Sequence, residues 1–266
     1  MSGVVRQDGP MVLPRAFALL RLLAASPRGL SLSDIATRLD VPKSSLSSTL
    51  KALADQGYLA RERALYSLGP QSFALASAIL AGKTISQIAR PSLEKAMEES
   101  GESVLLATLD PDGAHLTYVE IAESPNPVRY AVPVGTRRPL YATACGKLFL
   151  AERSEQARRA YYETTALEKK SDATVTDPEV LEGQLQVLRE SGVSITFGEY
   201  SADAAGFAAP IRGAGGALAA ALVIAAPITR GRREAERFAR LSVAAAGEIS
   251  GILGGASTEG REKPRA

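Results

Sequence analysis

Residues 30–58 read LSLSDIATRLDVPKSSLSSTLKALADQGY and contain the start and stop signals of two consecutive helices. Ser31 precedes an acidic residue, Asp34, by three positions, which is the pattern of a capping box at a helix start. Pro42 suits the first turn of a second helix, because its missing N–H is not needed there. Gly57 suits the end of that helix, since a left-handed terminal position favours glycine. The stretch therefore predicts two helices, over residues 32–39 and 42–56.

A further helix and a hairpin flank this pair. Residues 15–25 read RAFALLRLLAA, and apolar side chains recur there at helical spacing. Downstream, the runs 58–60 and 65–68 are typical of two short strands around RERA at 61–64. The order helix, helix, turn, helix, hairpin is that of a winged helix-turn-helix. The side chains expected to face its core from the first helix are Phe17, Leu20, Leu23 and Ala24.

In such a module the second helix of the turn pair enters the major groove of DNA. Four serines on its outer face are poor helix formers, so burial does not explain them. Lysine and serine at a helix start can hold phosphates and reach base edges. The alternative is a protein-interaction module with solvated charges. The candidate DNA contacts are Lys43, Ser44, Ser45, Ser47, Ser48 and Lys51 on the helix, with Arg61 and Arg63 in the wing.

The charge distribution agrees with a polyanion partner for the first part of the chain. The net charge is +2. Residues 1–70 hold nine basic and five acidic side chains, a net charge of +4, and the remainder carries −2. A basic module on a slightly acidic body favours nucleic-acid binding by the basic part. Scatter of solvated surface charge is the alternative explanation.

Composition excludes several other classes of protein. The chain has 266 residues, 45% of them apolar and 23% charged, which suits one or two globular domains. Its one cysteine and one histidine, Cys145 and His115, rule out an intrachain disulfide and a Cys/His zinc site. Phosphate-binding GxxxxGK[ST] and GxGxxG loops are absent. We therefore expect that the protein binds no metal and no cofactor and that it is not an enzyme. Catalysis by carboxylate or lysine side chains stays open, because composition does not bear on it.

Targeting signals are also lacking. The first ten residues, MSGVVRQDGP, contain no apolar segment of the kind found in secretory signals. The uncharged stretch 213–229 contains three glycines and a proline and is shorter than the roughly 20 residues of a membrane span. The expectation is a cytoplasmic protein without a membrane partner.

The remainder of the chain predicts a linker helix and an α+β domain. Apolar residues at 73–80 follow a helical stripe that ends near Gly82, which suggests a dimer contact or packing on its own domain. The turn DPDG at 110–113 separates two strands. The predicted helices are 85–100, 141–151, 176–190 and 232–253. The predicted strands are 104–109, 114–121, 128–132, 193–197, 207–212 and 218–225, with a loop at 133–138.

The chain resembles the IclR family of bacterial transcription regulators. The residues that carry the resemblance run in the expected order from about 12 to 253. They are PRAFALL (14–20), LSLSDIA (30–36), VPKSS (41–45), LKALADQGY (50–58), YSLG (66–69), RPSL (90–93), PLYATACGK (139–147), AAPI (208–211) and AALVIAAP (220–227).

The resemblance implies a repressor or activator that binds double-stranded operator DNA and responds to a small-molecule effector. It also implies self-association as a homodimer or a dimer of dimers. The alternative class is a small-molecule-binding enzyme that carries a winged helix. The implied parts are a winged helix-turn-helix domain (10–69), a linker helix (70–83), a GAF-like effector-binding domain (84–253) and a disordered tail (254–266).

Residue by residue, the resemblance also implies an effector site. Many family members carry a His-Arg-like pair where this chain has Ser47 and Ser48, so base readout differs here. In members that bind small oxoacids, serines tend to occupy the positions of Val223 and Ala225, so an apolar pocket floor is expected. The helix start at 144–145 still offers N–H groups to an anion. The implied effector residues are Tyr130, Ala144, Cys145, Thr196, Gly206, Val223 and Ala225.

These positions predict a pocket for a small aromatic or aliphatic acid, with an apolar floor and a polar rim. The alternative is a closed cavity in which Val223 and Ala225 are ordinary core residues. Cys145 has two interpretations of its own. At a helix start it could be a reactive or redox-sensing thiol, or it could be a small buried apolar group.

Overall fold

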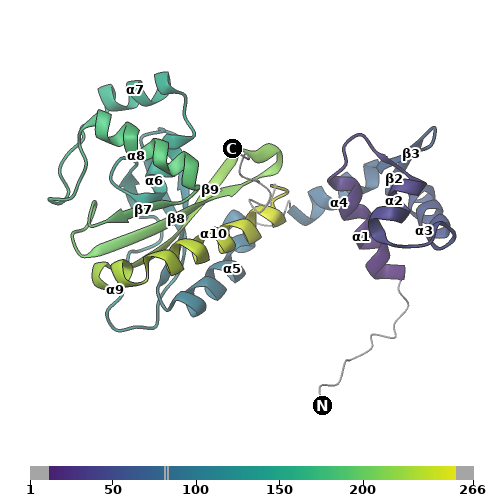
Figure 1. Cartoon of the computed structure of the whole chain (residues 1–266), viewed down its shortest axis with the longest axis horizontal. Helices are drawn as coiled ribbons and strands as arrows, with labels where there is room; N and C mark the ends of the chain where they lie inside the picture. The colour runs from purple at the N-terminus through teal and green to yellow at the C-terminus, as the bar shows by residue number, and fades with distance from the viewer. Residues whose placement is uncertain (1–11, 81, 83, 256–266) are drawn as a thin grey trace, which may run out of the picture. The chain divides into compact units, whose positions relative to one another are not determined.

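The computed structural model describes residues 12–80, 82 and 84–255 (Figure 1). The chain forms two compact units, with the boundary between residues 83 and 84. The predicted linker helix falls in the first unit, and the four-part division of the chain stays a prediction. The predicted tail lies outside the described residues from 256 onward.

The first unit is the predicted winged helix-turn-helix. Its helices surround a core of seven buried residues: Leu19, Leu23, Leu30, Ile35, Leu46, Leu50 and Leu59. A small antiparallel sheet with strand order β1-β3-β2 forms the wing. The elements are α1 (Val12–Ala24), β1 (Leu30–Ser31), α2 (Leu32–Leu39), α3 (Lys43–Asp55), β2 (Leu59–Glu62) and β3 (Leu65–Leu68).

The capping signals in the sequence act as predicted at α2. The Ser31 hydroxyl accepts the Asp34 N–H at 3.2 Å, and the Ser31 N–H donates to the Asp34 carboxylate at 3.2 Å. Asp40 ends α2 in the left-handed conformation, with φ 52°. Pro42 precedes α3 rather than lying in its first turn.

The inward face predicted for α1 is wrong at two positions. Phe17 is 60% exposed and Ala24 is exposed, whereas Leu19 and Leu23 face the core. The physical reason is that this segment is apolar on nearly all sides, so helical spacing alone does not select one face. Leu20 is partly buried and Leu23 buried, as predicted.

One more helix, α4 (Pro70–Leu80), completes the described part of the first unit. It packs against β2, and the Ser72 hydroxyl donates to the Tyr58 carbonyl at 2.7 Å. Its segment contains no charged residue, yet Phe73 and Ile79 are 61% and 58% exposed. Large apolar side chains on an uncharged helix need a covering surface to leave water.

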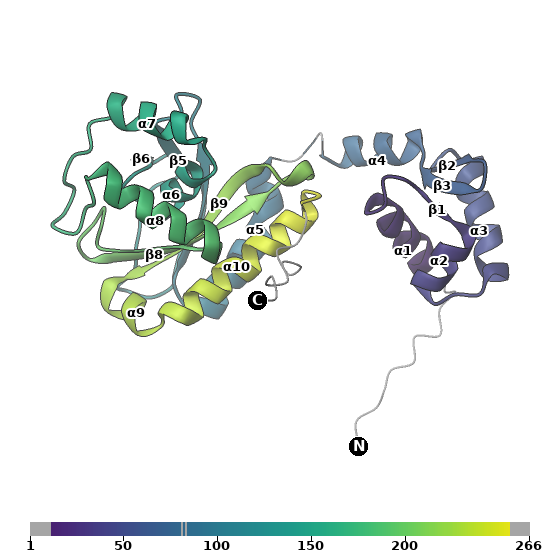
Figure 2. The same cartoon turned by 45° about the horizontal axis from the view of Figure 1, so that its top comes forward.

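The second unit is an antiparallel sheet covered by helices on both faces (Figures 1 and 2). Its strand order is β6-β5-β4-β9-β8-β7. The strands are β4 (Ser103–Leu109), β5 (His115–Ala122), β6 (Arg137–Pro139), β7 (Ser194–Phe197), β8 (Ala204–Arg212) and β9 (Leu218–Pro227). The helices are α5 (Ile85–Ser100), α6 (Ala144–Ala151), α7 (Glu155–Thr164), α8 (Pro178–Ser191), α9 (Ile228–Arg233) and α10 (Ala235–Ile252), with a short turn of 3-10 helix, η1 (Ala214–Gly216).

Alternation along the central strands builds two separate cores. Leu105 of β4 and Val223 of β9 face α6 and α8, whereas Leu106 and Leu222 face α5 and α10. This is the period-two pattern of a sheet buried on both faces. The candidate effector positions all belong to the side that carries α6. No helix in the described part of the chain is long and apolar enough to cross a membrane.

Several predicted elements of this unit are wrong. Residues 128–132 form no strand, and the strand beside β5 is instead β6, which begins in the predicted loop 133–138 and ends one residue beyond it. Prolines bound the 128–132 segment, and distant side chains bind its carbonyls. The helix predicted from 141 begins at 144, the last helix is divided into α9 and α10, and α7 was not predicted.

Candidate functional site

The predicted DNA-contact face of α3 is open to solvent. Leu46 and Leu50 are the buried side chains of this helix. Its N-cap residue, Pro42, supplies no side-chain hydrogen bond to the first turn. Backbone N–H groups at an uncapped helix start favour anions such as phosphates. The six predicted contact residues on α3 are all exposed: Lys43, Ser44, Ser45, Ser47, Ser48 and Lys51.

The wing presents the other two predicted contacts. Arg61 and Arg63 are exposed at the β2–β3 hairpin. The Arg61 guanidinium lies 5.4 Å from the ring centroid of Tyr66, which holds it against the sheet. Arg63 occupies the left-handed region with φ 56°, which is uncommon for a residue other than glycine. This conformation makes the tight turn that places a basic side chain at the hairpin tip.

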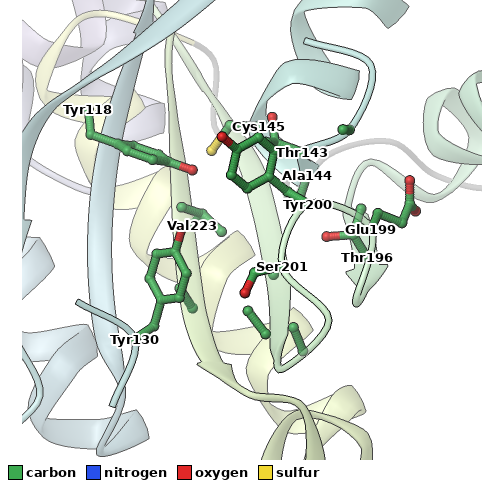
Figure 3. Close-up of a pocket in the computed structure, with 15 residues that line it drawn as sticks. Tyr118, Tyr130, Thr143, Ala144, Cys145, Thr196, Glu199, Tyr200, Ser201 and Val223 are labelled. Atoms are coloured by element: carbon green, nitrogen blue, oxygen red, sulfur yellow. The ribbon is translucent and has the colours of Figure 1, made fainter. Parts of the chain in front are cut away.

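The seven predicted effector residues converge on one cavity of about 50 Å³ in the second unit (Figure 3). They come from five places in the fold: the loop after β5, the start of α6, and strands β7, β8 and β9. Thr196 pairs with Gly206 across β7 and β8, and Gly206 pairs with Ala225 across β8 and β9. Sheet register therefore brings together residues that are distant in sequence. We call this space the inner cavity.

Gly206 keeps the inner cavity open. A Cβ atom at this position would lie 3.2 Å from the Thr196 hydroxyl and 3.3 Å from the Cβ of Ala144. Both distances are tighter than ordinary van der Waals contact. The floor beside it is apolar, as predicted, because Val223 and Ala225 line the cavity and bear no polar side-chain atom.

Sequence reasoning missed two tyrosines that line the inner cavity. Tyr118 from β5 and Tyr200 from the loop after β7 point their hydroxyl groups toward the same space as Tyr130 (Figure 3). Burial raises the pKa of the Tyr118 hydroxyl well above its ordinary value. Burial also raises the pKa of Tyr130, although the nearby Arg138 cation opposes the shift. Both phenols stay neutral at physiological pH and can donate as well as accept hydrogen bonds.

A larger cavity of about 420 Å³ adjoins the inner one, and we call it the outer cavity. The two cavities share Tyr130, Tyr200, Ser201 and Ala204 as lining residues. Arg138 of β6 lines the outer cavity, and its guanidinium lies 4.5 Å from the ring centroid of Tyr200. Nothing in the local sequence distinguishes Arg138 from Arg137, so it was not predicted.

A buried ion pair supports the wall of the inner cavity. Lys147 of α6 donates to both carboxylate oxygens of Glu199, at 2.6 and 2.5 Å, and to the side chain of Gln184 at 2.7 Å. Burial lowers the pKa of Lys147, and the Glu199 carboxylate opposes that shift. Glu199 itself lines the cavity. The pair therefore connects α6 and α8 to the loop that carries Tyr200.

The two loops that hold Tyr130 and Tyr200 are fixed by hydrogen bonds from side chains elsewhere in the second unit. The Ser103 hydroxyl donates to the Tyr130 carbonyl at 2.6 Å. Arg230, which is paired with the buried Glu102, donates to the Val128 carbonyl at 2.7 Å. The Thr174 hydroxyl donates to the Glu199 carbonyl at 2.6 Å, beside Tyr200. The tyrosines thus stand on a preorganised frame.

Cys145 is a buried thiol. Burial raises the pKa of its thiol, so the nucleophilic thiolate is suppressed. His115 lies at the surface turn 110–115, where its Nδ1 is 3.0 Å from the Asp112 carboxylate, and it lines neither cavity. Within the described residues no three His, Cys, Asp or Glu side chains cluster as metal ligands would. These facts favour the apolar interpretation of Cys145 over the redox one.

Comparison with known proteins agrees with both units. Residues 12–63 match the family model "IclR helix-turn-helix domain", and residues 77–251 match "Bacterial transcriptional regulator IclR C-terminal". The chain is 31% identical to the HTH-type transcriptional regulator BhcR of Paracoccus denitrificans, over 86% of this chain and 81% of that protein.

Two solved structures extend the likeness to the whole fold. The repressor BlcR of Agobacterium tumefaciens is 27% identical, with a TM-score of 0.78 over 94% of this chain and 100% of that one. An IclR homolog from Microbacterium hydrocarbonoxydans, solved in complex with 4-hydroxybenzoate, is 26% identical, with a TM-score of 0.59 over 91% of this chain and 98% of that one. The order of the motifs, the winged helix-turn-helix and these matches show that the chain belongs to the IclR family of bacterial transcriptional regulators.

Proposed function

We propose that this chain binds operator DNA through α3 and the wing, and that a small organic acid in the cavities of the second unit changes that binding. The observation that carries the first half is the exposed face of α3, where two lysines and four serines surround an uncapped helix start. Lysines there would neutralise phosphates, and serines would reach phosphates or base edges.

The observation that supports an organic-acid effector is the convergence of all seven implied positions on the inner cavity. A structural neighbour of the same fold binds 4-hydroxybenzoate. In this chain the wall formed by Val223 and Ala225 is apolar, so it suits an apolar part of the ligand better than the polar groups of a two-carbon oxoacid. The tyrosine hydroxyls supply the polar groups that orient such a ligand.

The proposed mechanism is a population shift between two arrangements of a dimer or a dimer of dimers. A ligand that binds one arrangement better than the other changes the fraction of molecules whose recognition helices match the operator spacing. Binding without turnover is expected, so the effector would be recovered unchanged.

The DNA-binding part is tested by fluorescence anisotropy on duplexes from the region upstream of the chain's own gene, with a salt series and an unrelated competitor. Specific binding with a steep negative salt slope is the expected result. Lys43→Ala and Lys51→Ala should each reduce the slope of log K against log salt by about 1. Lys169→Ala, an exposed lysine of the second unit, is the charge-matched control. Equal salt slopes in all three variants would contradict the assignment of α3.

The effector part is tested by calorimetry with 4-hydroxybenzoate and a panel of short aliphatic acids. Ala144→Trp should fill the inner cavity, because Ala144 is a small, buried lining residue, and should abolish binding. Val223→Asp should repel an acid from the floor. DNA binding without effector is measured in parallel to show that each variant folds. Binding that survives both substitutions would remove the inner cavity as the effector site.

A further inference from the structure

Because side chains alternate between the two faces of a strand, the two neighbouring arginines of β6 have different surroundings. Arg137 pairs with Asp110 and Asp112, each at 2.6 Å, on the outer side of the strand. Arg138, opposite Leu116 in the β5–β6 ladder, lines the outer cavity instead. The period of two along a strand accounts for this separation.

Among the residues that the structure describes, Arg138 has no acidic partner of the kind that Arg137 has. Its Nη1 donates to the Arg137 carbonyl at 3.0 Å, and its Nε is buried without a hydrogen-bond partner among the described residues. A buried, unpaired N–H of a cation is costly, and native structures usually satisfy such a group. Of the other charged groups that line the cavities, Glu199 is paired with Lys147 and Arg129 with Glu123. The exposed carboxylate of Asp203 also lines the outer cavity and has no ion-pair partner among the described residues.

The guanidinium is also held in a fixed orientation. The guanidinium lies over the ring of Tyr200, and Tyr200 lines both cavities. The planar guanidinium is therefore beside the junction between the two cavities. A fixed guanidinium presents two parallel N–H donors, the geometry that a carboxylate matches.

Volume decides which part of a ligand lies where. The inner cavity, at about 50 Å³, has room for a few water-sized groups, whereas a benzene ring has been held in an apolar cavity of about 150 Å³. The outer cavity, at about 420 Å³, has room for a substituted ring, and Val128, Val132 and Pro227 give it apolar walls.

We infer that Arg138 is the carboxylate anchor of an aromatic acid whose ring occupies the outer cavity beside Tyr130 and Tyr200. The inference rests on the proposed function, because it specifies how that site takes its effector. It places the anion on a side chain rather than on the N–H groups at the start of α6. The inner cavity then receives a small substituent of the ring, within reach of the tyrosine hydroxyls.

The test is isothermal titration calorimetry of the full chain with three probes: benzoate, 4-hydroxybenzoate and the neutral analogue benzamide. Arg138→Met should weaken both carboxylates about 10- to 100-fold, the usual weight of hydrogen bonds to a charged group. Benzamide should lose much less affinity, because its carbonyl can accept a hydrogen bond from the guanidinium but carries no charge. Arg138→Lys should recover part of the loss, because it keeps the charge but not the fork. Arg137→Met removes the same charge from the outer side of the strand and should leave the binding of all three probes at the wild-type level.

Three outcomes would overturn the inference. The first is equal benzoate affinity in the wild type and in Arg138→Met. The second is an Arg138→Met variant that loses affinity for benzamide by the same factor as for benzoate, which would indicate a purely structural arginine. The third is a wild-type chain that binds neither carboxylate. Anisotropy on operator DNA without effector is run on the same samples, so failure of the anchor is distinguished from failure of the DNA-binding function.

Discussion

At the scale of single residues, the surface turn 110–115 stabilises the ionised carboxylate of Asp112 by local hydrogen bonds. The backbone N–H of Ala114 and the ring of His115 hydrogen-bond to the Asp112 carboxylate and lower its pKa from 3.8 to about 2. The unfolded chain therefore binds more protons than the folded one between about pH 2 and 4, so stability rises with pH in that window.

Asp112→Asn tests this linkage. The variant should have a lower thermal unfolding midpoint than the wild type at pH 7, because the substituted amide carries no charge for Arg137 or for the N–H of Ala114. The difference should shrink as pH falls from 4 toward 2. Differential scanning calorimetry at several pH values measures it, with the exposed Asp172→Asn as the charge-matched control. A difference that stays constant across this range would contradict the assignment.

The Lys147–Glu199 pair is an electrostatic interaction in the interior of the second unit. Removing either partner alone leaves a buried charge without compensation, which costs about 3–5 kcal/mol. Lys147→Met and Glu199→Gln should each lower the free energy of unfolding by this amount. Urea titrations of both variants and of the double variant Lys147→Met/Glu199→Gln measure the coupling. The double variant should lose less than the two single losses added together, and strict additivity would show that the groups act independently.

At the scale of elements, two helix glycines have opposite roles. A Cβ at Gly146 of α6 would lie 2.2 Å from the Leu140 carbonyl oxygen and 2.3 Å from its Cα, so the close passage of α6 over that backbone requires glycine. At Gly183 of α8 no described atom outside the adjoining backbone of its own helix lies within 4 Å of the same position. Gly146 sits two residues after Ala144, so the same close passage sets the inner cavity wall.

Gly146→Ala and Gly183→Ala form a matched pair on these helices. The first should destabilise the second unit by several times the ordinary ~1 kcal/mol cost of a mutation, because rigid backbone must move. The second should stabilise it by about 0.5–1 kcal/mol, the helix-propensity gain of alanine over glycine. Denaturant midpoints decide the matter, and a tolerated Gly146→Ala would show that α6 can shift away from Leu140.

Elements with local signals could be predicted, and those set by distant contacts could not. Ser31 and Asp34 carry the whole cap of α2 within four residues, so the sequence reveals it. The segment 128–132 looks like a strand because Val128, Tyr130 and Val132 alternate, yet Ser103 and Arg230 bind its carbonyls from elsewhere in the chain. The distinct surroundings of Arg137 and Arg138 depend on the register with β5, which only the folded sheet defines.

The candidate site divides in the same way. The seven effector positions came from motifs whose order resembles a known family, and the sheet register brings them to one cavity. Tyr118, Tyr200 and Arg138 carry no such motif. Their contribution arises from strand alternation and from a loop held by Thr174, which are properties of the assembled unit.

At the scale of the whole molecule, we predict that a second copy of the chain covers the exposed apolar surface of α4. The segment PQSFALASAIL lacks charge, and Phe73, Leu75 and Ile79 are 61%, 45% and 58% exposed. A helix that is apolar on all sides is normally buried. A second copy of the chain would cover it by a two-fold symmetric contact, and would also supply a second recognition helix for a palindromic operator.

Substitutions on α4 should therefore affect assembly and DNA binding together. Phe73→Glu and Ile79→Glu place a charge in the proposed contact and should raise the dimer dissociation constant about tenfold or more, the effect typical of a hot-spot residue. Affinity for a two-half-site operator should fall in parallel, because one recognition helix then binds alone, whereas the salt slope per α3 helix stays the same.

Gln71→Glu, at the solvent-exposed first turn of the same helix, is the charge-matched control. Sedimentation velocity across a concentration series and anisotropy on one- and two-half-site duplexes give the two readouts. Variants that sediment like the wild type yet lose operator binding would place α4 in DNA recognition rather than in self-association, and variants unchanged in both readouts would show that its apolar surface has neither role.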